Sequence, residues 1–101
     1  MKLGEIASLI RSKNAGPFVL TFDIVLPDEA SYMRVKRSGV LTVARFAELF
    51  RCSPASVRFF DCDNARAFKF SIPRPITQGD LGDGDLHGGQ QFVPLMDIDV
   101  P

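Results

Sequence analysis

Apolar residues near the start of the chain recur at two different spacings. Over residues 3–11 they fall at positions i, i+3, i+4 and i+7, which is one face of a helix, although Gly4 weakens this pattern. Over residues 18–26 every second residue is large and apolar, which is the period of a strand. The sequence therefore predicts a helix over residues 3–11 and a core strand over residues 18–26.

Capping residues mark two helices after this strand. Asp28 and Gly39 are typical N-terminal and C-terminal caps for a helix over residues 29–38. Thr42 begins a second short helix with apolar residues at helical spacing. Ser53–Pro54 then favours one extra turn, because proline is tolerated in the first turn of a helix. We expect two consecutive helices and a short turn.

The second half of the chain reads as strands and a long loop. Residues 57–61 and 67–72 are β-rich runs joined by a turn, "CDNA", whose polar residues bond their own backbone. The proline- and glycine-rich stretch 73–91 predicts a loop, and loops of this length are usually functional or disordered. Residues 96–100 alternate apolar and acidic positions, which predicts a half-buried last strand.

This order of elements predicts the α+β class. A strand, helices, two strands and a further strand are typical of a ferredoxin-like sandwich, with a mostly antiparallel sheet of about four strands and helices on one face. The usual second crossover helix is missing, and the glycine-rich loop or the N-terminal helix would take its place. The length of 101 residues fits a single α+β domain over residues 1–101.

Composition indicates one aromatic core and no polyanionic partner. An apolar fraction of 46% and nine phenylalanines exclude a disordered chain. The 12 basic residues balance 12 acidic ones, so we expect no nucleic-acid partner. Basic residues nevertheless crowd segments 11–13, 34–37 and 66–74, whereas acidic ones concentrate over 80–99. This distribution suits docking onto a mixed-charge partner, and a solvated surface explains it equally well.

The cysteines and the first residues favour a cytoplasmic protein. Cys52 and Cys62 lack metal-ligand spacing and read as small buried thiols. The opening "MKLGEIASLI" carries charges where a signal peptide would be apolar. The longest apolar run is too short to span a bilayer, so we expect no membrane association.

The polar stretch "RSKNAG" before the first core strand has two interpretations. Arg11, Ser12, Lys13 and Asn14 combine two cations, a hydroxyl and an amide, which together form a competent cradle for a carboxylate or phosphate. Cations with asparagine and glycine are also usual at the C-terminus of a helix. The stretch is not a phosphate-binding Walker loop, because the required order and spacing of glycine, lysine and serine are absent.

The long loop carries further polar residues. Its acids alternate beside the single histidine; they are Asp80, Asp83 and Asp85, next to His87. They fit neither the calcium-loop pattern nor a zinc ligand set, so we read the acids as solvated turn residues and expect no metal. His87, Gln90 and Gln91 flank two glycines, an arrangement that suits docking or substrate positioning.

Arg74 lies between two prolines at the start of this loop. A rigidly presented arginine suits bidentate contacts with a carboxylate, and a plain strand exit explains it too. No nucleophile–base pair can be read from the sequence, so a self-contained hydrolase is not indicated. We expect no cofactor, and the sequence leaves open whether the protein is an enzyme.

Four segments resemble a small family of single-domain bacterial proteins of unknown function. They are "KLGEIASLIRSKNAGPFVLTFDIV", "PDEASYMRVKRSGVLT", "IPRP" and "GGQQFVPLMDIDVP". The resemblance covers essentially the whole chain, and its first and last motifs are the most specific. Members of that family are typically encoded beside proteins resembling AtuA, the acyclic terpene utilisation protein.

The chain is also similar, more weakly, to the ferredoxin-fold domain that closes many AtuA-like proteins. The matching positions are Leu3–Ala7, Arg11, Ser12 and Leu95–Val100. The sequence departs from that domain by the insertion of Leu9 and Ile10 and by its residues 13–16. The resemblance therefore carries over Arg11 and Ser12 more firmly than Lys13.

These resemblances imply that some proteins carry the small domain fused and others make it as a separate subunit. We hypothesise a small subunit of an AtuA-like catabolic enzyme complex that acts on a carboxylate or acyl substrate. Arg11–Asn14 would bind a small anionic ligand at the rim of the sheet, and Arg74 would supply a second cation. The loop with His87, Gln90 and Gln91 would complete a site shared with the larger AtuA-like subunit.

The alternative hypothesis is a stand-alone module without catalysis. Its homo-oligomer would be a homodimer that pairs through sheet edges. This module would bind a ligand or a partner. Apolar residues around Phe59, Phe60 and Phe92 motivate this alternative. RNA binding by such a sheet is not favoured, because the stacking signature and the basic balance are lacking.

Overall fold

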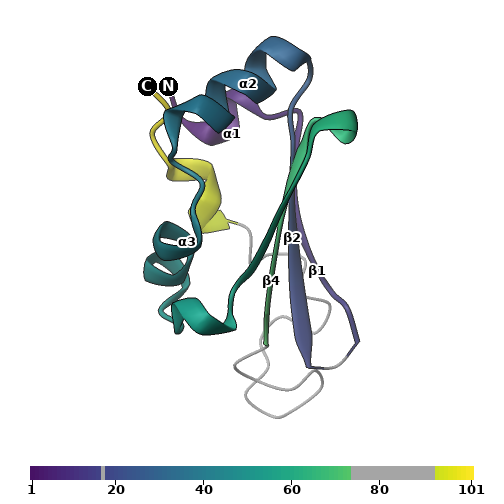
Figure 1. Cartoon of the computed structure of the whole chain (residues 1–101), viewed down its shortest axis with the longest axis vertical. Helices are drawn as coiled ribbons and strands as arrows, with labels where there is room; N and C mark the ends of the chain where they lie inside the picture. Colours follow the sequence, from purple (N-terminus) through teal and green to yellow (C-terminus); the bar gives the residue numbers. More distant parts are fainter. Residues whose placement is uncertain (17, 74–92) are drawn as a thin grey trace.

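The described part of the chain folds into four antiparallel strands and three helices. A computed structural model describes residues 1–16, 18–73 and 93–101, and within them one sheet has the strand order β1-β2-β4-β3. The strands are β1 Leu9–Asn14, β2 Val19–Val25, β3 Arg58–Cys62 and β4 Ala67–Pro73. The helices are α1 Leu3–Ile6, α2 Glu29–Ser38 and α3 Val43–Phe50, and the 3-10 turns are η1 Pro54–Ser56, η2 Asp63–Ala65 and η3 Val93–Asp97. The three helices lie on one side of the sheet (Figure 1), which confirms the α+β class.

The strand order is compatible with a ferredoxin-like sheet whose elements follow one another along the chain in a different order. The ferredoxin-like pattern β-α-β-β-α-β places a helix and a strand after its central hairpin. Here a helix and a strand, α1 and β1, come first instead, and β1 occupies the edge beside β2. The connection from β2 through α2 and α3 to the β3–β4 hairpin keeps the expected order.

The predicted helix over residues 3–11 is wrong beyond its first turn. It ends at Ile6, and Ala7 already has an extended backbone. Leu9–Asn14 forms β1, with Arg11 opposite Asp23 of β2. The physical reason is that β2 is a buried strand whose backbone needs hydrogen-bond partners on both sides. The turn that joins β1 to β2 contains Gly16, whose φ of +83° suits glycine.

The predicted last strand over residues 96–100 is also wrong. Its first two residues, Met96 and Asp97, end η3, and its remaining described residues form one isolated bridge, between Lys2 and Asp99. The edge beside β2 where a last strand would pair is already occupied by β1. The C-terminal segment pairs with the N-terminus instead, because the Leu3 N–H donates to Ile98 O (2.8 Å) and the Val100 N–H to Met1 O (2.8 Å).

The helix predictions from capping residues are confirmed. The Asp28 side chain accepts a hydrogen bond from the Ser31 N–H (2.7 Å), and Gly39 ends α2 in the left-handed region. Thr42 caps α3 by accepting from the Arg45 N–H (3.1 Å). These signals are correct because a cap depends only on residues within one turn.

Gly4, which weakens the helix pattern, lies where α1 and η3 touch. A Cβ atom on Gly4 would lie 3.1 Å from Cβ of Met96 and 3.2 Å from its carbonyl oxygen. The missing side chain therefore allows the first and last segments of the chain to pack closely.

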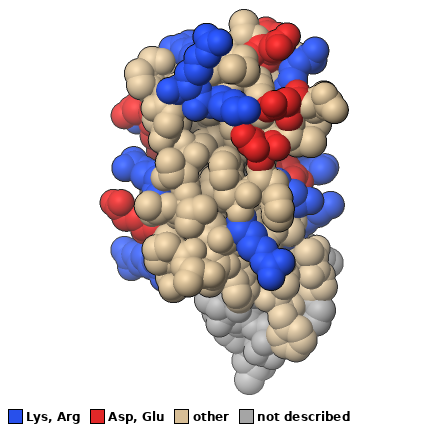
Figure 2. Space-filling view, in the orientation of Figure 1, with Lys and Arg blue, Asp and Glu red and all other residues tan. Residues whose placement is uncertain are grey.

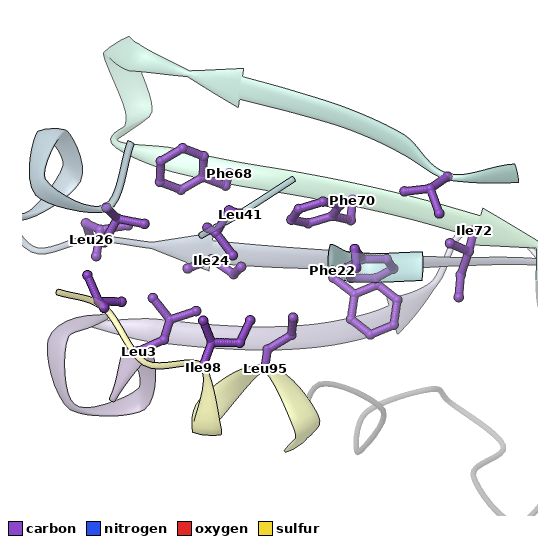
Figure 3. Packing of buried hydrophobic residues seen from close by; sticks show 14 of the residues in the cluster. Leu3, Phe22, Ile24, Leu26, Leu41, Phe68, Phe70, Ile72, Leu95 and Ile98 are labelled. Atoms are coloured by element: carbon purple, nitrogen blue, oxygen red, sulfur yellow. The ribbon is translucent and has the colours of Figure 1, made fainter. Parts of the chain in front are cut away.

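The core lies between the sheet and the helices and is rich in phenylalanine. Its residues on the two central strands are Leu20, Phe22, Ile24, Phe68, Phe70 and Ile72. Phe46 of α3 stacks on Phe70 with ring centroids 4.3 Å apart and contacts Phe22 edge-on at 5.0 Å. Figure 3 shows Leu3, Leu95 and Ile98 in a row beside these central strands. The core thus joins both ends of the chain to β2 and β4.

A polar cluster ties α2 to the β3–β4 turn. The buried Tyr32 hydroxyl donates to Asp63 Oδ1, and Lys36 Nζ lies 2.9 Å from the same oxygen and 3.3 Å from Asp61 Oδ2. Burial, followed by the hydrogen bond to the Asp63 carboxylate, raises the pKa of Tyr32 to about 12. The hydrogen bonds from Tyr32 and Lys36 lower the pKa of Asp63.

The aromatic core makes a sharp stability prediction. Phe22 is fully buried and its ring lies 4.8 Å from that of Phe50, so Phe22→Ala leaves a cavity and should lower the free energy of unfolding by about 3–5 kcal/mol. The matched control is Phe60→Ala, because Phe60 is 56% exposed, and its effect should stay within about 0.5 kcal/mol. Urea denaturation of both variants measures the difference, and equal effects would contradict this description of the core.

Tyr32 makes a pH prediction. It is the single tyrosine and the chain has no tryptophan, so tyrosinate absorbance reports this residue alone. Ionisation should show a midpoint near pH 12, above the ordinary 10.0. Because the folded pKa is raised, the stability that Tyr32 contributes is complete below pH 10 and is lost as the pH rises toward 12.

Asp63→Asn is the variant that tests the cause of this shift. It removes the carboxylate charge beside the hydroxyl, so the pKa of Tyr32 should fall toward its ordinary value. Asp99→Asn, at the other end of an exposed ion pair with Lys2, is the control and should leave the tyrosinate midpoint unchanged. A tyrosinate midpoint that is the same in Asp63→Asn as in the unaltered protein would refute the contribution of the contact between Tyr32 and Asp63.

Candidate functional site

One face of the sheet is turned away from the helices, and we call it the outer face. Side chains alternate across a strand, so the register places every second residue on this face. These residues are Leu9, Arg11 and Lys13 of β1, Val19, Thr21, Asp23 and Val25 of β2, Ala67, Lys69, Ser71 and Pro73 of β4, and Arg58, Phe60 and Cys62 of β3. Their neighbours along each strand face the helices and the core.

The register aligns the charged residues of the outer face in two rows. The first row is Arg11, Asp23, Lys69 and Phe60, and the second is Lys13, Thr21, Ser71 and Arg58. Neighbouring strands lie about 4.8 Å apart, so each row spans about 14 Å between its outer Cα atoms. Each row therefore begins with a cation on the β1 edge and carries a second one on β4 or β3.

The outer face has an excess of positive charge. It carries four cations and one carboxylate, Asp23, whereas the whole chain has a formal net charge of zero. Arg11 Nε donates to Asp23 Oδ2 at 3.0 Å. Within the part of the chain that the structure describes, none of the other three cations, Lys13, Lys69 and Arg58, has an ion-pair partner. These three charges are available to an anion.

The opposite situation holds at the end of the molecule where α2 and the two termini lie. Figure 2 shows Lys and Arg crowded there beside Asp and Glu. The pairs include Lys36 with Asp61 and Asp63. Because the charges at this end neutralise one another, it is a weaker candidate for anion binding than the outer face.

A groove crosses the outer face where β2, β4 and β3 lie next to one another. Its volume is about 540 Å³, and its lining residues are Val19, Ala55, Ser56, Arg58, Phe60, Ser71, Ile72 and Pro73. Arg58 is the one charged residue among these, and Ser56 and Ser71 supply hydroxyls. The other lining residues that the structure describes are apolar, so this described part of the groove combines one cation with an apolar surface.

The structure separates the four residues of the predicted cradle. Arg11 and Lys13 are exposed on the outer face, whereas Ser12 is 5% exposed and, with Asn14, points to the other side of the sheet. Ser12 and Asn14 both have other interaction partners. The cations of "RSKNAG" are thus brought together, but its hydroxyl and amide do not join them. The helix-end interpretation of this stretch is wrong, since the stretch is a strand and a turn.

The other predicted site residues lie outside the described residues. These are Arg74, His87, Gln90 and Gln91, together with the acids of the long loop. Their roles stay predictions.

Sequence reasoning missed Arg58, Lys69 and Ser71 as candidate site residues. In "VRFFD" and "FKFS" these residues alternate with phenylalanines. This alternation places them on the face of the sheet that is turned away from the core. The alternation does not reveal that β4 brings Ser71 beside Arg58. Cys62, expected to be buried, is exposed on the same face, and Cys52 is half-buried.

Residues 1–16, 18–73 and 93–101 contain no group of three or more histidine, cysteine or acidic side chains placed to hold a metal ion. No helix in the same ranges combines the length and the apolar character that a membrane crossing needs.

Comparison with known proteins places the chain in a family without supplying an activity. Neither the curated proteins nor the solved structures gave a match. The family model of a domain of unknown function, DUF4387, matches residues 3–99. This match confirms the expected family of unknown function, while the association with AtuA-like proteins stays a prediction. Because the match spans nearly the whole sequence, the chain belongs to the DUF4387 family.

Proposed function

We propose that this protein is a small companion subunit that binds a carboxylate or acyl substrate for a larger AtuA-like catabolic enzyme. The observation that carries the anion-binding part is the outer face, where three cations have no ion-pair partner among the described residues. The resemblance of the sequence to proteins encoded beside AtuA-like ones supports the larger partner.

The chemistry of the outer face suits binding more than catalysis. Guanidinium and ammonium groups recognise carboxylates through charge-assisted hydrogen bonds. The outer face supplies such cations and the hydroxyl of Ser71, and its one acid is engaged by Arg11. A reaction would therefore depend on groups that the larger subunit brings to the same face.

A second candidate function is a homodimeric binding module without catalysis. Phe60 supports it, because this large apolar side chain is 56% exposed on β3, which lies at one edge of the sheet. Exposed edge strands pair readily with a second chain. The two candidates differ in the partner that they require, so the assembly state separates them.

The first test is assembly. Co-expression with the AtuA-like larger subunit should give a complex that stays together in size-exclusion chromatography with a fixed ratio of the two chains. Separate elution of the two proteins, with this chain sedimenting as a tight homodimer, would favour the second candidate. Separate elution as a stable monomer would contradict both.

The second test is charge reversal on the outer face. Lys13→Glu combined with Lys69→Glu should weaken butyrate binding to the full chain by about tenfold or more, since each reversal replaces attraction by repulsion on the face that binds the anion. The matched control is Arg37→Glu with Arg45→Glu, which makes the same change of net charge on α2 and α3. Isothermal titration calorimetry measures both.

Salt gives an independent check of the same proposal. Butyrate binding to exposed cations should weaken as ionic strength rises, because the Debye length falls to about 8 Å at physiological salt. An equal loss of affinity in the outer-face variant and in the control, or binding that is indifferent to salt, would argue against an anion site on this face.

A further inference from the structure

We infer that the groove on the outer face binds a short amphipathic monocarboxylate, with the carboxylate on Arg58 and the apolar chain along Val19, Phe60 and Pro73. This inference rests on the proposed function and narrows its ligand class. The groove is then the binding site, and Lys13 and Lys69 attract the anion to it through their electrostatic field.

Arg58 is placed to bind a carboxylate at one wall of the groove. It is exposed and lies directly opposite Ser71 in the β3–β4 pairing. Directly opposed residues in antiparallel strands have their Cβ atoms about 4.5–5.5 Å apart, so the guanidinium and the hydroxyl can reach the same ligand. No residue that the structure describes engages either side chain. A guanidinium binds a carboxylate through two parallel hydrogen bonds, and the serine hydroxyl can donate a further one.

The apolar walls explain why the ligand has a hydrocarbon chain. Val19 and Phe60 are 36% and 56% exposed, and Pro73 lies opposite Val19 on the neighbouring strand. Large apolar side chains gain free energy when a ligand removes them from water. A ligand that carries one charge and a short chain satisfies Arg58 and covers these residues at the same time.

The size and charge of the groove set further limits on the ligand. A volume of about 540 Å³ lies within the usual range for small-molecule sites. Arg58 is the only cation among the described lining residues, so a second negative charge on the ligand would find no further cation among them, only the hydroxyls of Ser56 and Ser71. The groove therefore favours a monocarboxylate over a phosphate or a dicarboxylate.

The β1 side of the outer face is less suited to holding the ligand directly. Arg11 is already bonded to Asp23, whose side chain is 14% exposed. Thr21, which lies between Lys13 and the groove, is 5% exposed, so its hydroxyl offers little accessible surface to a ligand. Lys13 and Lys69 remain close enough to attract an anion through their field.

Titration of the full chain with a chain-length series tests this inference. The probes are acetate, butyrate and hexanoate, with hexanol and inorganic phosphate as the uncharged and the polyanionic comparisons. Affinity should rise roughly threefold to fourfold for each methylene group that becomes buried. Hexanol and phosphate should both bind more weakly than hexanoate. An affinity independent of chain length, or phosphate binding as tightly as hexanoate, would overturn the inference.

Variants locate the two ends of the ligand. Arg58→Met keeps the apolar stem but removes the charge, and should weaken hexanoate binding by about tenfold or more. Arg37→Met on α2 is the control and should change the affinity for hexanoate less than twofold, because a distant charge is screened by salt. A change of that size is roughly the scatter between repeated titrations. Val19→Ser should flatten the chain-length dependence while acetate affinity stays unchanged. Hexanoate binding as tight in Arg58→Met as in the unaltered chain would overturn the assignment.

A measurement on the unaltered protein keeps the test independent of any variant. On addition of hexanoate, the amide resonances of Val19, Phe60 and Ser71 should shift, and those of α2 should not. A different result would be shifts confined to β1, together with weaker binding of acetate and phosphate in the variant that combines Lys13→Glu and Lys69→Glu. This result would support the proposed function and contradict this inference. No binding of any anion would remove both.

Discussion

The pairing of β2 on both of its edges is the constraint on which the rest of the structure depends. β2 lies between β1 and β4, and its core side carries the fully buried Phe22 and Ile24. A strand buried in this way must satisfy its backbone hydrogen bonds within the protein. β1 and β4 satisfy its two edges, and the helices cover the face that carries the apolar residues, so the opposite face carries the polar ones.

This one-sided arrangement links the fold to the proposed function. The helices and the C-terminal segment pack their apolar residues against β2 and β4, as the row of Leu3, Leu95 and Ile98 shows (Figure 3). Phe68, Phe70 and Ile72 of β4 face the core. Because successive side chains of a strand point to opposite faces, Lys69 and Ser71, which alternate with them in the sequence, lie on the outer face. The cationic outer face is therefore a direct consequence of how the core is packed.

The four residues of the predicted cradle are divided between the two faces of the sheet for a physical reason. The residue types of "RSKNAG" indicated an anion site, and its two cations do lie on the outer face. The prediction treated four consecutive residues as one cradle, which a helix end would allow and a strand forbids, because successive side chains of a strand point to opposite faces. Ser12 consequently belongs to the inner side, and the polar residues in line with Lys13 on the outer face come from β2, β4 and β3.

The sequence by itself determined the features that depend on near neighbours. The caps Asp28, Gly39 and Thr42, the helices between them and the alternation of β2 follow from interactions within a few residues. The tertiary structure alone decided that residues 9–14 form a strand, that residues 96–100 do not extend the sheet, and that Arg58 lies beside Ser71. These outcomes depend on which strand gains the edge of β2 and on the register of the β3–β4 hairpin, and both are settled by contacts between residues far apart in the chain.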